Sequence, residues 1–183
     1  VRQIGYSPKE FAQLIIDKEG GLKKAKKLFD KSEIKPSDYL PEDVKKDSAG
    51  EKYSKILNRV FDNSYDFSHY NRASSIYWPG NRLGHGREDV SKFWNSLKNI
   101  FTEIKFTIEH IGYIDEPNKN PRASIRWFLE GIHSNDSDDY GKKTNSKLFI
   151  MGINHVELNK DSIIREWVLF DEVAIWKQIL MNK

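Results

Sequence analysis

The chain has 183 residues, enough for one domain with a sizeable core and some additional structure. Hydrophobic residues make up 38 % of the sequence and charged residues 31 %, and no apolar stretch is long enough to span a bilayer. This composition indicates a globular protein that does not associate with a membrane. The absence of Cys excludes disulfides, cysteine nucleophiles and thiolate metal sites, and we expect a cytoplasmic protein.

The net charge is +3, and the excess of Lys lies near the N-terminus. The segment from Lys23 to Phe29 alternates Lys with apolar residues, which predicts an amphipathic helix with a solvated basic face. The sequence contains no Gly-rich phosphate loop and no interleaving of aromatic residues with Arg. We therefore expect no nucleic-acid partner.

Residues 1–47 are predicted to form a helical, Lys-rich arm or linker. Ser7-Pro8-Lys9-Glu10 is a capping box with Pro at the first helical position, and Gly20-Gly21 ends the helix that it starts. The second helix, from Lys23 to Phe29, follows directly. Pro36 and Pro41 mark a loop before the main domain, which we place at residues 48–183.

The main domain is predicted to contain helices first and long strands afterwards. Ser48 caps a helix that runs to Phe61, and a second amphipathic helix follows Gly84-His85-Gly86. The predicted strands cover residues 73–78, 105–114, 122–133, 147–158 and 163–176, with a polar loop at 134–145. This order predicts an α+β fold in which helices pack on one face of a curved antiparallel sheet.

Two ionisable residues lie among alternating apolar residues of the last two predicted strands. Counting by twos from Trp167 passes Leu169 and reaches Asp171, which predicts an indole and a carboxylate on one face. Counting back from His155 passes Ile153 and other apolar residues, so the imidazole is also predicted to lie on an apolar face. A carboxylate and an imidazole in one apolar concavity are candidates for proton transfer without a cofactor.

Several segments, in their order along the chain, resemble the SnoaL-like group of the nuclear transport factor two superfamily. They are Trp78-Pro79-Gly80, Gly84-His85-Gly86-Arg87-Glu88-Asp89-Val90, Arg126-Trp127-Phe128-Leu129-Glu130-Gly131-Ile132-His133, Gly152-Ile153-Asn154-His155-Val156-Glu157 and Ile164-Arg165-Glu166-Trp167-Val168-Leu169-Phe170-Asp171-Glu172. The resemblance covers about residues 50 to 181. The segment from Gly5 to Leu22 resembles the stretch before the second copy in two-copy members, which would make this chain a C-terminal half or a relative that kept the arm.

The resemblance implies a cone-shaped fold, with a strongly bent antiparallel sheet and about three helices around one pocket, and a homodimer formed through the sheet. Founding members are polyketide cyclases that close a ring by an intramolecular aldol reaction with an acidic base and neither metal nor cofactor. Carried over to this chain, Asp171 would be the general base. His155 would stabilise the enolate of a small carbonyl compound.

The expected pocket would hold a hydrophobic small molecule. Its expected lining comprises Trp127, Trp167, Trp78, Tyr77, His133 and Arg126. Glu157 lies two residues from His155, but no third ligand has suitable spacing, so we expect no metal site.

Two alternatives are open from the sequence. Asp171 could instead cap a turn or pair with Arg165 or Arg126, and His155 could be a satisfied histidine without a functional role. The protein would then be a non-catalytic binding or oligomerisation module. Convergence of Asp171 and His155 on one void would favour catalysis, and divergence would favour binding.

Overall fold

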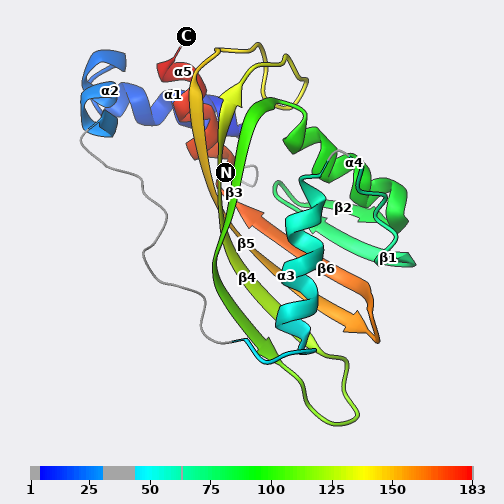
Figure 1. Cartoon of the computed structure of the whole chain (residues 1–183). Helices are drawn as coiled ribbons and strands as arrows, with labels where there is room; N and C mark the ends of the chain where they lie inside the picture. Colours follow the sequence, from blue (N-terminus) through cyan, green and yellow to red (C-terminus); the bar gives the residue numbers. More distant parts are fainter. Residues whose placement is uncertain (1–4, 31–43, 63, 183) are drawn as a thin grey trace.

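The computed structural model describes residues 5–30, 44–62 and 64–182. Helices and strands alternate irregularly along these ranges (Figure 1). In chain order they are α1 (Pro8–Lys18), α2 (Leu22–Asp30), α3 (Ala49–Val60), β1 (Tyr70–Trp78), β2 (Arg82–His85), α4 (Gly86–Lys98), β3 (Phe101–Ile114), β4 (Arg122–His133), β5 (Lys147–Asn159), β6 (Ser162–Phe170) and α5 (Glu172–Met181). The predicted loop between Pro36 and Pro41 lies outside the described residues. None of the helices described is long and apolar enough to cross a membrane.

The six strands form one sheet in the order β2-β1-β6-β5-β4-β3. Neighbouring strands are antiparallel except for β1 and β6, which run parallel. The sheet bends around α3 and α4, which lie across one of its faces (Figure 1). This arrangement confirms the predicted α+β fold with helices on one face of a curved sheet.

The inner face of the sheet, toward α3 and α4, holds most of the core. Along β5, the buried positions are the even-numbered ones from Leu148 to Leu158. On β6, Glu166, Val168 and Phe170 are buried, whereas Trp167 and Leu169 are exposed. Trp167 and His155 therefore lie on the outer face, and not together with Asp171 in one concavity as expected.

Helix α5 replaces the second half of the predicted last strand, which was expected to continue to Trp176. The chain leaves the sheet after Phe170, and Asp171 becomes the N-cap of the helix. Ile175, Trp176 and Ile179 follow at helical spacing and are buried. The apolar run favoured a strand by composition, but its periodicity and the capping Asp171 favour a helix.

Helix α5 also covers a free edge of the sheet. Strand β6 ends opposite Gly152, so none of the described strands pairs with β5 at Phe149 on that side. The Gln178 side chain accepts a hydrogen bond from the Phe149 N–H (2.9 Å) and donates one to the Phe149 carbonyl oxygen (2.8 Å). A side-chain amide thus takes the place of the missing strand.

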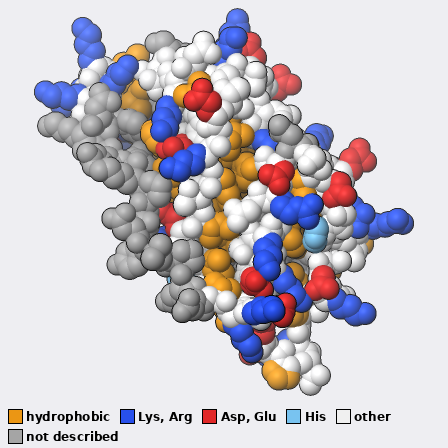
Figure 2. Space-filling view, in the orientation of Figure 1, with side chains coloured by type: hydrophobic (Ala, Val, Ile, Leu, Met, Phe, Trp, Pro, Cys, Tyr) orange, Lys and Arg blue, Asp and Glu red, His pale blue; other side chains and the backbone are white. Residues whose placement is uncertain are grey.

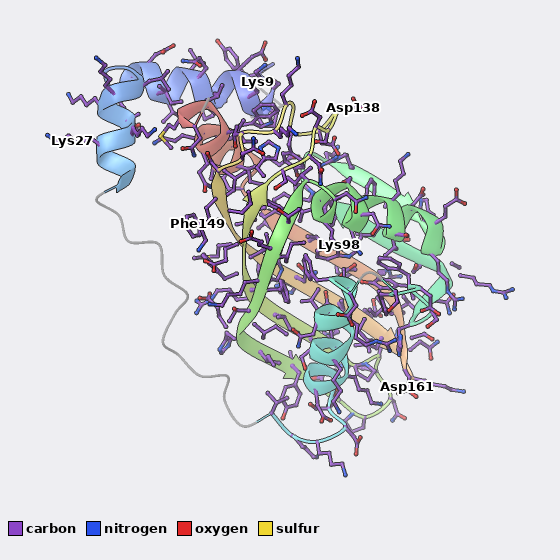
Figure 3. The ribbon with its side chains drawn as sticks, turned by 45° about the horizontal axis from the view of Figure 1, so that its top comes forward. Lys9, Lys27, Lys98, Asp138, Phe149 and Asp161 are labelled. Carbon is purple, nitrogen blue, oxygen red and sulfur yellow. The ribbon has the colours of Figure 1, made fainter. Side chains whose placement is uncertain are left out.

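The N-terminal helices pack against α5 at the end of the sheet (Figure 1). Ile16 and Ala25 form a small apolar cluster with Met181, separate from the main core. Lys177 forms an ion pair with Glu19 (2.6 Å), and the Lys9 ammonium lies over the Trp176 ring, 5.4 Å from its centroid (Figure 3). The proposed boundary after residue 47 stays a prediction.

Candidate functional site

A buried carboxylate lies at the centre of the space between the sheet and its helices. Glu166, on the inner face of β6, is completely inaccessible to solvent. Its carboxylate accepts hydrogen bonds from the hydroxyls of Tyr53 (2.5 Å) and Tyr70 (2.9 Å). The Asn154 amide (2.9 Å) and the Trp94 indole N–H (3.3 Å) donate two more. We call Glu166 and these four donors the Glu166 network.

Each donor of the Glu166 network comes from a different element. Tyr53 lies on α3, Tyr70 begins β1, Trp94 lies on α4 and Asn154 lies on β5. The hydrogen bonds therefore connect both covering helices to three strands of the sheet.

The orientation of the Asn154 amide is fixed from two sides. Its Nδ2 donates to the Tyr53 hydroxyl (2.7 Å) as well as to Glu166, and its Oδ1 accepts from the Trp127 indole N–H (2.8 Å). The Trp127 ring lies directly over Gly152 on the neighbouring strand, where any Cβ would overlap it. The bare backbone of Gly152 therefore gives Trp127 the room to reach Asn154.

Burial dominates the electrostatics of the network. Desolvation raises the pKa of Glu166 above its ordinary value, although the four hydrogen bonds act in the opposite direction. Burial, followed by the neighbouring Glu166 charge, also raises the pKa values of Tyr53 and Tyr70 well above their ordinary value. A carboxyl of raised pKa next to two hydroxyls can exchange protons, but in this conformation all three groups are covered by protein.

Asp171 does not point into this interior. Its carboxylate accepts hydrogen bonds from the backbone N–H groups of Val173 (2.8 Å) and Ala174 (3.1 Å), and the residue is exposed. These contacts match the capping alternative. The other two alternatives do not hold, because Arg126 pairs with Glu109 and Arg165 pairs with Glu157.

His155 lies on the outer face of the sheet, away from the helices. It is exposed, and its Nε2 lies 3.2 Å from the Ser124 hydroxyl on β4. Trp167 is the strand partner of His155, and Asp171 follows Trp167 by four residues, about 13 Å farther along the strand. The structure therefore does not bring Asp171 and His155 together.

The predicted pocket residues divide between the two faces of the sheet. Trp127 and Trp78 are buried on the inner side. Trp167 and Tyr77 lie outside, with their rings stacked 5.4 Å apart and nearly parallel. Arg126 is half-exposed at its ion pair with Glu109.

His133 lies on the inner side but away from the Glu166 network. Its imidazole is buried at the end of β4, and its Nδ1 lies 3.4 Å from the Thr144 hydroxyl. Burial lowers its pKa, which favours the neutral imidazole.

A groove on the outer face joins two of the predicted residues, His155 and Trp167. Its volume is about 670 Å³. We call it the outer groove. It is lined by Gly112, Tyr113, Ile114, Arg122, Ala123, Ser124, His155, Val156 and Trp167. Gly112 and Ser124 are partners across β3 and β4. Because Gly112 carries only a hydrogen and the Ser124 side chain is small, an open space remains between the larger side chains of the lining.

Comparison with solved structures identifies the architecture. A proposed SnoaL-like polyketide cyclase from Shewanella putrefaciens superposes with a TM-score of 0.56 at 16 % identity, over 72 % of this chain and 84 % of that one. The chain has the SnoaL-like fold. No family model and no curated protein matches the sequence.

Two further structures show how widely the SnoaL-like fold is shared. IdmH, a proposed polyketide cyclase from Streptomyces antibioticus, has a TM-score of 0.56 at 14 % identity and covers 70 % of this chain and 96 % of its own. A proposed SnoaL-like polyketide cyclase from a Jannaschia species has a TM-score of 0.54 at 12 % identity, with coverages of 69 % and 90 %. At these identities the likeness establishes the fold alone.

The sequence pattern does not single out Glu166, Asn154, Tyr53 and Tyr70 as a group. Both faces of β6 are apolar, because Val168 and Phe170 alternate with Trp167 and Leu169. Counting by twos from Val168 would have reached Glu166, but nothing in the alternation shows which face is inner. In the described part of the chain no three His, Asp or Glu residues are grouped so that they could hold a metal ion.

The raised pKa of Glu166 predicts a specific pH dependence of stability. In the folded protein Glu166 keeps its proton to a higher pH than it does in the unfolded chain. Its contribution to the free energy of unfolding is therefore full below about pH 4.3, and it is lost as the pH rises through the pKa of Glu166 in the folded protein. We expect the stability advantage of the native chain over Glu166→Gln to be greatest near pH 4 and to fall toward neutral pH. Urea unfolding across this range measures the advantage.

Glu88→Gln provides the control, because Glu88 is exposed in the first turn of α4. The stability difference between this variant and the native chain should change much less over the same pH range. A native advantage over Glu166→Gln that is constant with pH would contradict the prediction.

Proposed function

We propose that this SnoaL-like protein binds a small, largely apolar molecule in the outer groove. The observation that carries the proposal is the groove itself, because its volume of about 670 Å³ suits a small ligand. Trp167 and Ile114 offer aromatic and apolar surface, whereas Arg122 and His155 offer polar contacts at its lining. This composition favours an aromatic or alicyclic body that carries a carbonyl or acidic group.

Binding is preferred to catalysis at Asp171 because the two proposed catalytic residues diverge. The Asp171 carboxylate is occupied by the N-terminus of α5, and His155 lines the outer groove without a carboxylate among the other lining residues. A general base must reach the proton that it removes. The described lining of the outer groove offers recognition groups but no carboxylate base.

Filling the outer groove should weaken binding. We expect Ser124→Leu to weaken the binding of anilinonaphthalene sulfonate, an aromatic anion, by about tenfold or more, because the added carbons occupy the space between β3 and β4. Fluorescence titration of the folded protein measures this change. Thr107→Leu is the matched control, since Thr107 is on β3 but does not line the groove. Equal affinity of both variants would refute the assignment.

A second candidate function, acid–base catalysis on a small carbonyl compound without a cofactor, is supported by the Glu166 network. Its carboxyl has a raised pKa, and the Tyr53 and Tyr70 hydroxyls could donate hydrogen bonds to a developing enolate. A substrate would reach these groups only after α3 moved away from the sheet. Under this proposal the base is Glu166 rather than Asp171.

Exchange of α-protons into D₂O tests the second candidate without knowledge of the natural substrate. If the native chain catalyses exchange in any of a panel of small cyclic ketones, followed by NMR, we expect Glu166→Gln to abolish it. The Asp171→Ala variant should still catalyse the exchange. Its free energy of unfolding should be lower by about 1 kcal/mol, because the substitution removes the N-cap of α5. The reverse pattern would restore Asp171 as the base, and no exchange by the native chain would reject this candidate.

We further propose that two copies pair through the outer face of the sheet. Met151 and Leu169 lie on the same outer face, with 54 % and 65 % of their surface exposed. Exposed apolar side chains on the face of a sheet favour association with another protein surface. A face-to-face pair would be symmetric, because the same strands meet their own copies.

Sedimentation measures the pairing directly. We expect the native chain to sediment as a dimer and Leu169→Asp to sediment as a monomer, because a carboxylate at the contact would lose its hydration. Leu14→Asp is the control, since Leu14 is also exposed but lies on α1. A monomeric native chain would contradict this proposal and leave the groove proposal intact.

A further inference from the structure

A second cavity, of about 610 Å³, lies beside α3 on the other side of the molecule from the outer groove. Helix α3, the residue before β1 and the turn between β5 and β6 supply its walls. We call it the α3 cavity. It is lined by Lys52, Lys55, Ile56, Asn58, Arg59, His69 and Asp161.

Three cationic side chains of α3 converge on the α3 cavity. Lys52, Lys55 and Arg59 are spaced by three and four residues, so they follow one another along one side of the helix. Lys and Arg side chains are visible over α3 in the space-filling view (Figure 2). Like charges at this spacing repel one another, so an anion between them would be favoured.

Among the described lining residues Asp161 is the only carboxylate, and Glu51 lies just outside the lining. Asp161 lies in the turn between β5 and β6 (Figure 3) and forms an ion pair with Lys52 of α3 (2.7 Å). Its side chain is 81 % exposed. Lys55 pairs with Glu51 on its own helix. The Arg59 guanidinium lies over the Tyr65 ring, 5.3 Å from its centroid. When Glu51 is counted with the lining side chains, one more positive than negative charge is present.

His69 adds an unused polar group to the same cavity. Its Nδ1 is buried and has no hydrogen-bond partner among the described residues. Its ring stacks against Tyr65, with ring centroids 6.1 Å apart. A buried ring nitrogen without a partner is costly unless a ligand or water completes its hydrogen bonding.

We propose that the α3 cavity binds a small molecule that carries a phosphate monoester. A phosphate dianion would pair with Lys52, Lys55 and Arg59 together, and the planar Arg59 guanidinium can bind two of its oxygens. Asn58 and His69 add polar contacts, and the aliphatic stems of Lys52 and Lys55 provide apolar surface for the organic part of the ester.

A compact ligand fits the α3 cavity better than a polymer does. Its volume falls in the range of small-molecule sites. The cationic side chains of the lining all come from one helix, three turns long, instead of following an extended strip along the surface. The bound phosphate would compete with Asp161 for Lys52, which makes Asp161 a negative determinant of affinity.

Titration calorimetry with phenyl phosphate tests the proposal, at an ionic strength held constant with NaCl. We expect Arg59→Gln to weaken binding by about tenfold. Asp161→Asn should strengthen binding by about threefold, because it releases Lys52 from its ion pair. A gain from removing an exposed carboxylate is a result that loss of folding cannot produce.

The matched control compares two similarly exposed lysines. Lys55 and Lys105 have 70 % and 68 % of their side chains exposed, and each lies near one Glu. Lys55→Gln should weaken binding, whereas Lys105→Gln on β3 should leave it unchanged. Equal effects of these two variants, or an Asp161→Asn variant that binds no more tightly than the native chain, would overturn the proposal.

Two reference ligands separate the phosphate monoester from its parts. Phenol should not bind, and inorganic phosphate should bind more weakly than phenyl phosphate because it makes no contact with the aliphatic stems of Lys52 and Lys55. Inorganic phosphate binding as tightly as the ester would overturn the assignment to an ester. Binding of phenol as tightly as phenyl phosphate would overturn the role of the cations.

Discussion

The burial of Glu166 is the constraint on which the rest of the inner structure depends. A carboxylate taken out of water must find hydrogen-bond donors inside the protein, because an unpaired buried charge costs several kcal/mol. Here the donors come from α3, α4, β1 and β5, so the positions of two helices and three strands are tied to one side chain. The apolar core determines that the helices pack on the sheet, and the Glu166 network determines where they do so.

The outer face of the sheet has a different character. Its apolar side chains, Leu169 and Met151 among them, are exposed rather than packed under helices, and small residues at Gly112 and Ser124 leave a groove between larger ones. The proposed ligand and the proposed second copy both use this face. The phosphate proposed for the α3 cavity would lie on the helical side, so binding there can be measured independently of association.

Helix α5 joins the sheet to the N-terminal arm through a few directional contacts. Asp171 starts the helix, Gln178 completes the hydrogen bonds of β5, and Lys177 reaches Glu19 of the arm. Asp171 was the leading candidate for a base, yet it is engaged by the backbone N–H groups that a helix start leaves unpaired. The Asp171 carboxylate thus serves as the N-cap of α5.

The sequence by itself determined the α+β class, the capped helices at Ser7 and Ser48 and the strands that alternate in hydrophobicity, because these depend on local spacing. It also carried a resemblance sufficient to anticipate the SnoaL-like fold. It did not determine which face of β5 and β6 is inner, because Trp167 and Leu169 are as apolar as Val168 and Phe170. Only the tertiary structure decided this, since α3 and α4 cover a single face, and in doing so they enclose Glu166 and leave His155 outside.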